Sequence, residues 1–372
     1  MQKRYESLDG LRGLAALTVV IYHTLFQISL PTAVWTLVPP VSVFWAGRQA
    51  VVLFFVLSGF VLALPFHQGR AQPYVRFVLK RALRLYPVYA LAILLSAAWA
   101  AVLTSHFAHT GLLSTTDVLA LYLPMVGPYH VGIIDQPVWT LIHEIRISLV
   151  FPALLALIRG RWGHLPALLL LSAGAAGLAQ LTGNDLFGSV GYVPMFLIGA
   201  WLARHHEQIR TWYGRRPLWQ RLLWMGAGVG LYGTSARELG LPYTLWQIPL
   251  TVGGGLLLVS ALAEPAFSGF LMRRPLQLLG AMSYSLYLIH GLVLWPLMPM
   301  LLPRMPALEA AALCWILIFA ATYLTYRFVE LPSMRLSRLA WLSRAPRRYV
   351  QELGPQLGAV RIGAAPEGRP GL

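Results

Sequence analysis

RQAVVLFFVLSGFVLALPF, residues 48–66, is the stretch that decides the fold class. It carries one charge, at its first position, and shows no alternation of polar and apolar residues. An α-helix of about 20 residues crosses the hydrocarbon core of a bilayer. Backbone groups inside lipid must bond to one another, so an uninterrupted apolar run of this length predicts a transmembrane helix.

Similar runs recur along the whole chain. Hydrophobic residues make up 57% of the 372 residues and charged residues 11%, whereas a soluble domain carries about 25% charged residues. We therefore predict an all-α integral membrane protein with about ten transmembrane helices. The expected spans are 8–29, 48–66, 86–105, 138–158, 164–182, 186–203, 218–235, 243–263, 276–299 and 307–328.

Two parts of unequal length are expected. Residues 1–335 form the transmembrane domain, and residues 336–372 form a basic tail that turns rich in Pro and Gly. Such a tail is expected to be loosely ordered and cytoplasmic.

The net charge of +16 would suit a nucleic-acid partner, but the positions of the basic residues indicate membrane orientation instead. With a cytoplasmic N-terminus, almost all of the 29 Lys and Arg fall on the cytoplasmic side. The exceptions are Arg48, Arg237 and Arg304 on the other side and Arg146 within the fourth span. This bias follows the positive-inside rule, so both termini are expected in the cytoplasm, in contact with anionic lipid and not with nucleic acid.

The segment 67–86, HQGRAQPYVRFVLKRALRLY, is predicted to be an amphipathic helix lying at the cytoplasmic interface. Arg76, Lys80 and Arg84 recur every four residues with Arg81 beside them, while Val and Leu supply an apolar side. Guanidinium groups suit phosphates, so the segment is a candidate site for a phosphate-bearing donor. Attachment to anionic lipid is the alternative explanation of the same charges.

The first span carries polar residues that are expensive at membrane depth and are therefore functional candidates. In SLDGLRGLAALTVVIYHTL, Arg12 and His23 share one helix face, with His23 about 16 Å further from the cytoplasm. Asp9 precedes Arg12 by three residues, the spacing of an ion pair within a helix. The alternative is an anchoring arginine and a lone histidine that bonds to another helix.

The fourth span, PVWTLIHEIRISLVFP, contains the only acidic residue deep within a predicted span, Glu144. Thr140 and Ser148 lie one turn to either side of it, which makes a polar stripe. The alternative is a structural ion pair of Glu144 with Arg146 or with a neighbouring helix.

The ninth span, PLQLLGAMSYSLYLIHGLVLWP, places Ser283, Tyr287 and His290 on one face. Buried Tyr and His also bond simply across helices, so a structural role is the alternative here. Counted from the helix ends, His23, Glu144 and His290 fall at a similar height, roughly 20 Å above the inner face. This agreement favours one shared polar cavity that opens toward the outside.

Six segments, in order from about residue 7 to 332, resemble the acyltransferase-3 family of integral membrane acyltransferases. They are SLDGLRGLAALTVVIYH, VVLFFVLSGF, KRALRLYP, WTLIHE, SYSLYLIH and FVELP. The resemblance implies transfer of an acyl group, commonly acetyl from acetyl-CoA, to a hydroxyl of an extracytoplasmic carbohydrate or related acceptor. By position, Arg12 and His23 match the family's essential pair, and Arg81 and Arg84 match donor-side residues. Many members carry Phe-Tyr where this chain has Ile147-Ser148.

Residues and resemblance together predict a multi-pass enzyme of the bacterial cytoplasmic membrane in which His23 is the general base or a transient acyl carrier. The basic side chains expected at the phosphates of acyl-CoA are Arg76, Lys80, Arg81 and Arg84. The candidates for charge balance and oxyanion donation are Glu144, Asp9, His290, Tyr287 and Ser283. No metal is required, and the single Cys314 indicates neither a zinc nor a redox site.

Three other classes of membrane protein are alternatives. A proton-coupled secondary transporter would use His23, Glu144 and His290 as a relay, but no internal repeat is evident. An intramembrane serine protease would use Ser58-Gly59, but Val56 breaks the Gly-x-Ser-Gly pattern. A structural or sensory membrane protein is the third class.

Overall fold

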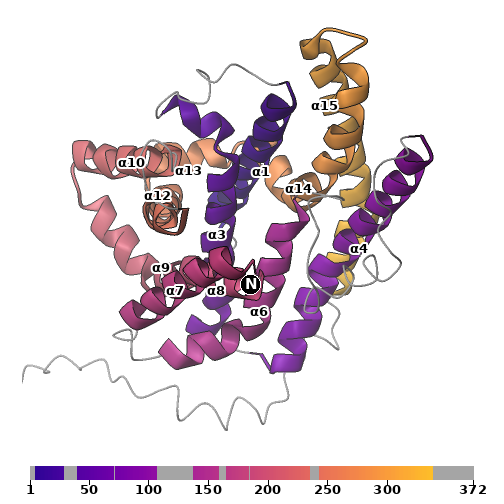
Figure 1. The fold of residues 1–372 in the computed structure, drawn as a ribbon. Coiled ribbons are helices and arrows are strands. Elements are labelled where there is room, and N and C mark those ends of the chain that lie inside the picture. The colour runs from indigo at the N-terminus through magenta and orange to yellow at the C-terminus, as the bar shows by residue number, and fades with distance from the viewer. Residues whose placement is uncertain are drawn as a thin grey trace, which may run out of the picture.

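The computed structural model describes residues 5–28, 40–70, 72–106, 137–158, 165–183, 185–234 and 243–337, and every regular element in these ranges is helical (Figure 1). The elements are α1 (Glu6–Gln27), η1 (Val41–Trp45), α3 (Gly47–His67), α4 (Tyr74–His106), α6 (Val138–Ile158), α7 (Leu165–Thr182), α8 (Asp185–Gly191), α9 (Val193–Gly214), α10 (Leu218–Gly233), α12 (Tyr243–Ala263), α13 (Pro265–Leu271), α14 (Arg274–Leu301), α15 (Ala307–Thr325), the π-helical η4 (Tyr326–Glu330) and α16 (Leu331–Leu336). The all-α prediction is confirmed for these residues.

Within the described ranges, seven helical segments are long and apolar enough to cross a membrane. They are Gly47–His67, Tyr74–Trp99, Val138–Leu157, Leu186–Gly214, Trp246–Ala263, Arg274–Leu301 and Ala307–Leu336. The other three predicted spans also fall on helices, namely α1, α7 and α10. The count of ten spans and the cytoplasmic termini stay predictions, and the tail from residue 338 onward lies outside the described residues.

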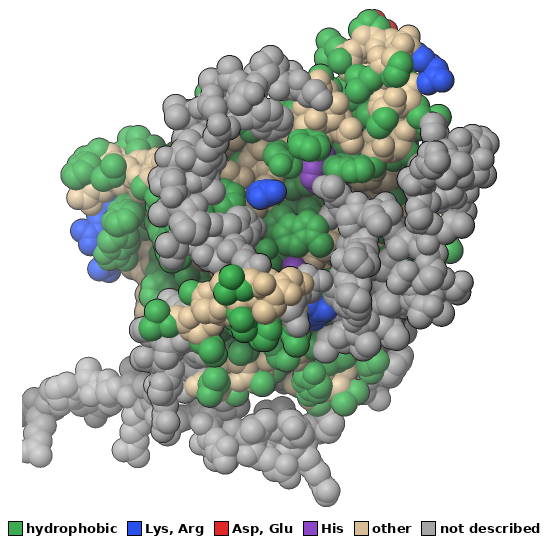
Figure 2. All heavy atoms as spheres, in the orientation of Figure 1, with side chains coloured by type: hydrophobic (Ala, Val, Ile, Leu, Met, Phe, Trp, Pro, Cys, Tyr) green, Lys and Arg blue, Asp and Glu red, His purple; other side chains and the backbone are tan. Residues whose placement is uncertain are grey.

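On the face drawn in Figure 2, hydrophobic side chains are spread widely over the described surface and Lys, Arg and His appear at only a few points, as expected for helices that contact lipid. The interior is built around α3, which packs against α1, α9 and α12. Phe55, Val56 and Phe60 of α3 are fully or almost fully buried in this core. Figure 1 shows α1 and α3 in the middle of the helix arrangement. Leu8, Leu11 and Val19 of α1 are accordingly buried in this core.

Helices α1 and α14 make the closest contact that bears on function. A Cβ on Gly13 would lie 2.5 Å from the backbone nitrogen of Gly280, and a Cβ on Gly280 would overlap the backbone of Asp9. Small residues let two helices approach this closely. Ten residues beyond these glycines, each helix carries a histidine, His23 on α1 and His290 on α14. The glycine contact therefore sets the register that brings the two histidines to one level, about 15 Å further along both helices.

Gly280→Ala is expected to destabilise the protein by about 1–3 kcal/mol, because the new methyl group forces α1 and α14 apart. It is also expected to lower activity by separating the histidines. Gly226→Ala on α10 is the matched control, since a Cβ there meets nothing within 4 Å. Thermal unfolding in detergent measures both variants. Equal unfolding temperatures for the two would contradict a tight α1–α14 contact.

The helix predicted over 67–86 is found from Tyr74 onward, but it is not an element separate from the next predicted span. Its place at the membrane interface stays a prediction. Residues from Tyr74 onward form the first half of α4, which continues without a break through Pro87 to His106. Arg, Lys, Leu and Ala dominate this half and all favour helix. Two of its arginines, Arg81 and Arg84, lie near acidic residues of other helices, described below.

Candidate active site

Two histidines from α1 and α14 meet inside the protein. Nδ1 of His23 lies 2.8 Å from Nε2 of His290. The other nitrogen of His290, Nδ1, lies 3.0 Å from the carbonyl oxygen of Leu286 one turn earlier. His290 is 0% exposed, whereas His23 is partly exposed. The two histidines that were predicted at similar depth are therefore in direct contact, and His23 is the accessible member.

Aromatic rings hold the imidazole of His23 in place. The ring of Trp295 from α14 stands edge-on to it, with 4.8 Å between ring centres. The ring of Tyr22 lies 5.2 Å away. Nε2 of His23 has no hydrogen-bond partner among the residues that the structure describes. This nitrogen is thus not committed to another described side chain.

The hydroxyls of Tyr287 and Ser283 both form hydrogen bonds within the protein. The hydroxyls of Tyr287 and Thr140 are 2.7 Å apart, and Thr140 also donates to the carbonyl of Pro137. The hydroxyl of Ser283 donates to the carbonyl of Gly280 at 2.9 Å, within α14. The Thr140–Tyr287 contact holds α6 against α14 near the histidines. The hydroxyl hydrogen of Ser283 is used in a bond within α14.

Glu144 does not join the histidines but pairs with Arg81 of α4. Nη2 of Arg81 lies 2.5 Å from Oε1 of Glu144, and the guanidinium also donates twice to Oγ of Ser148. The hydroxyl of Ser58 donates to the same carboxylate oxygen at 2.8 Å. The side chains of Arg81 and Glu144 are 12% and 18% exposed, so this is a largely buried ion pair. The predicted stripe of Glu144 and Ser148 therefore faces α4 and binds an arginine.

Two further arginines lie close to this pair. Arg12 is 3.6 Å from Asp9 on the same helix and interacts electrostatically with Arg84, Glu144 and Glu330. Arg84 interacts electrostatically with Arg81 and with the same acids, and its side chain is exposed. We call this set, Arg12, Arg81, Arg84, Asp9, Glu144 and Glu330, the arginine cluster.

Glu330 was not identified from the sequence. It lies in the π-helical turn η4 and is 5% exposed, and its Oε2 accepts bonds from the amide and hydroxyl of Ser285 on α14. A π-turn at the end of an apolar helix often marks a functional site. The segment FVELP contained the only available signal, an acidic residue directly after a long apolar run.

Arg76 and Lys80 precede the cluster on α4, and each is partly exposed. They interact electrostatically with each other. Of the four basic residues expected at the donor phosphates, Arg81 is thus paired with Glu144. Arg76, Lys80 and Arg84 form no ion pair within 4 Å with another described residue.

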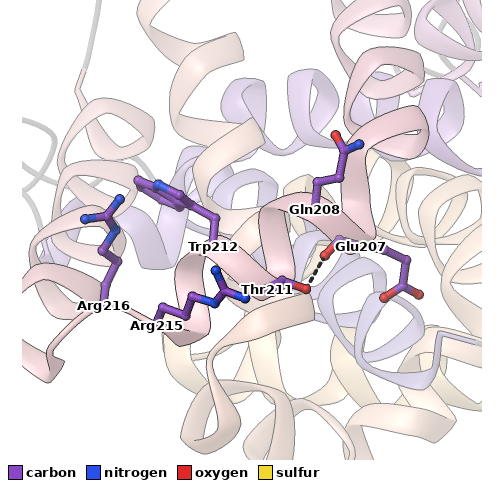
Figure 3. Close-up of a pocket in the computed structure, with 6 residues that line it drawn as sticks. All are labelled: Glu207, Gln208, Thr211, Trp212, Arg215 and Arg216. Atoms are coloured by element: carbon purple, nitrogen blue, oxygen red, sulfur yellow. Dashed lines mark hydrogen bonds between the residues drawn. The ribbon is translucent and has the colours of Figure 1, made fainter. Parts of the chain in front are cut away.

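A cavity of about 590 Å³ lies elsewhere, at the carboxyl end of α9 (Figure 3). Glu207, Gln208, Thr211, Trp212, Arg215 and Arg216 line it. The guanidinium of Arg216 lies over the ring of Trp212, 4.6 Å from its centre. None of the residues predicted for the site lines this cavity. Across the described residues, no three His, Cys, Asp or Glu side chains are grouped as a metal site.

These observations define a class of helical protein with membrane-length apolar helices, a pair of hydrogen-bonded histidines and a separate cluster of arginines and acids. Residues 5–326 match the acyltransferase domain of the acyltransferase-3 family, so the chain belongs to this family. The resemblance seen in the six motifs is therefore confirmed.

Two relatives extend the comparison. The chain is 25% identical over 373 aligned residues to the peptidoglycan O-acetyltransferase OatA of Listeria monocytogenes, covering 89% of this chain and 56% of that protein. It is 39% identical over 102 residues to protein 2 of the picA locus of Rhizobium radiobacter, covering 26% of this chain and 46% of that protein. The chain thus spans about half the length of these relatives. No solved structure matches it.

Proposed function

We propose that the protein is a membrane O-acyltransferase that moves an acyl group, acetyl above all, from acyl-CoA in the cytoplasm to a hydroxyl of an extracytoplasmic carbohydrate. The family and the peptidoglycan O-acetyltransferase among its relatives support this activity. The observation that carries it is the histidine pair, because it leaves a ring nitrogen of His23 free for chemistry inside the membrane domain.

The arginine cluster is proposed to bind the phosphates of the donor. Arg84 is exposed and lies within electrostatic range of Arg12 and Arg81, so three guanidinium groups raise the local potential for an anion. Arg81 is held by Glu144 and Ser148, which fixes one wall of this site. Arg84, with Arg76 and Lys80 before it on α4, is then the contact that the phosphates meet.

The reaction is proposed to occur at His23. Its Nε2 takes the proton of the acceptor hydroxyl as the oxygen attacks the thioester carbonyl, the carbon–sulfur bond breaks, and the proton passes to the departing thiolate of CoA. In a two-step version Nε2 attacks the thioester carbonyl and CoA leaves as its thiolate. The acceptor oxygen then attacks the acyl carbon, the carbon–Nε2 bond breaks, and the hydroxyl proton ends on the CoA thiolate. Both versions need Nε2 without a proton.

The transporter interpretation finds less support in this geometry. Glu144 is bonded to Arg81, Ser58 and no histidine, so the three residues of the proposed relay fall into two separate groups in the described chain. The protease interpretation would need Ser58 as a nucleophile, yet its hydroxyl is bonded to Glu144.

Arg84→Gln is expected to raise the KM for acyl-CoA about 10- to 100-fold, the loss of a charge-assisted hydrogen bond worth about 1.5–3 kcal/mol. The KM for the acceptor is expected to stay within a factor of three. Release of CoA by the protein in lipid nanodiscs measures both constants. Arg215→Gln, in the cavity of Figure 3, is the control and is expected to leave the donor constant unchanged. A raised donor KM for Arg215→Gln together with an unchanged donor KM for Arg84→Gln would place the donor at that cavity and contradict the role proposed for Arg84.

A further inference from the structure

His290 has both ring nitrogens engaged by the protein. Its Nδ1 faces the carbonyl oxygen of Leu286 at 3.0 Å. A carbonyl oxygen only accepts hydrogen bonds, so Nδ1 of His290 carries a hydrogen. A neutral imidazole has one N–H, which leaves Nε2 of His290 as an acceptor.

The neutral form of His290 follows from its surroundings. The side chain is 0% exposed, and no carboxylate is hydrogen-bonded to either histidine among the described residues. A buried imidazolium without an acidic partner is strongly disfavoured. Nε2 of His290 therefore accepts from Nδ1 of His23, which must itself carry a hydrogen.

The relative orientation of the rings agrees with such a bond. The two ring planes are 10° from parallel and the ring centres are 5.1 Å apart. A ring nitrogen lies about 1.1 Å from the centre of an imidazole, so a straight, in-plane N–H···N bond puts two ring centres about 5 Å apart. The lone pair of His290 thus points along the N–H of His23, and the rings lie edge to edge.

We propose that His290 is a positioning residue that holds His23 in the Nδ1–H tautomer and so presents Nε2 of His23 as an unprotonated base or nucleophile. The chain of bonds runs from the carbonyl of Leu286 through His290 to His23. Because His290 is buried and both of its nitrogens are used, it does not donate to an oxyanion, the role expected from the sequence. Its part in catalysis rests on the proposed function, whereas the tautomer does not.

The tautomer is measured directly by nitrogen NMR of histidine in the protein, labelled with ¹⁵N and embedded in lipid. Ring nitrogens with and without a hydrogen have separate chemical shifts, and a His23→Asn variant assigns the signals of His23. The expected result is a protonated Nδ1 and an unprotonated Nε2 on His23. A His23 signal with its hydrogen on Nε2 would overturn the proposal.

Kinetics test the consequence of the tautomer. His290→Leu removes the acceptor and is expected to lower kcat about 10²- to 10⁴-fold, as loss of the correct histidine tautomer does in serine proteases. The donor KM is expected to change less than threefold. His290→Gln keeps an acceptor oxygen in reach of His23. Its kcat is expected to be at least tenfold higher than that of His290→Leu, which a purely structural role would not predict.

The two proposals fail in different ways. The Nδ1–H tautomer without any acyl transfer by the wild-type protein would overturn the proposed function and leave the tautomer standing. Full transfer with the other tautomer, or with His290→Leu within threefold of wild type, would overturn the role of His290 alone.

Discussion

Replacing His23 by Ala is expected to lower acyl transfer at least about 100-fold, the range of a lost general base. The reason is that His23 is the partly exposed member of the pair and that its Nε2 is bonded to no described residue, which makes it the proposed base. O-acyl esters on a carbohydrate are released by mild alkali. The measurement is therefore the acetate freed by alkali from the envelope of cells that carry the variant as their only copy of the gene.

His205→Ala is the matched control for that experiment. His205 lies on α9 and is partly exposed, and its side chain hydrogen-bonds to Gln208 and to no other described residue. This variant is expected to keep wild-type acetate release. Equal amounts of both proteins in the membrane fraction show that insertion is unaffected. If His23→Ala released as much acetate as His205→Ala, the site would have to be sought elsewhere in the chain.

Breaking the Arg81–Glu144 pair is expected to have the largest effect on stability. Arg81→Leu leaves the carboxylate of Glu144 largely buried without its charge partner, which costs about 3–5 kcal/mol. The double variant, Arg81→Leu with Glu144→Leu, leaves no unpaired charge and is expected to recover most of that loss. Thermal unfolding in detergent, followed by circular dichroism, gives the three stabilities.

Arg304→Ala is the reference variant. Arg304 is exposed, and among the described residues its side chain bonds only to the backbone carbonyl of Met300. Its expected change lies within about 0.5 kcal/mol. A loss for Arg81→Leu no larger than for Arg304→Ala would mean that Arg81 is not a structural partner of Glu144. That result would favour the prediction from the sequence, that Arg81 binds the phosphates of the donor.

Hydropathy made most of the fold predictable, because a helix in lipid needs a long apolar run and each such run stands out in the sequence. Counting residues from the helix ends also predicted that His23 and His290 lie at the same depth. In the structure, Nδ1 of His23 and Nε2 of His290 are 2.8 Å apart. That count succeeded because α1 and α14 touch through Gly13 and Gly280, at equal distances from the two histidines.

Partner choice between helices was not predictable in the same way. Glu144 lay at the height of the histidines by counting, but which way a side chain faces depends on how the helix is turned against its neighbours. The partner of Glu144 proved to be Arg81, whose charge suggested a cytoplasmic surface. Glu330 was missed for a related reason, since a single acidic residue gives no hint that Ser285 and the arginines of other helices surround it.

A structure of the protein in a lipid nanodisc with a non-hydrolysable thioether analogue of acetyl-CoA would test the central claim most directly. We expect phosphate density at Arg84 and the acyl carbonyl about 3–3.5 Å from Nε2 of His23, the distance of a reactive complex. Phosphate density in the cavity between Trp212 and Arg216, with the acyl group remote from His23, would contradict it.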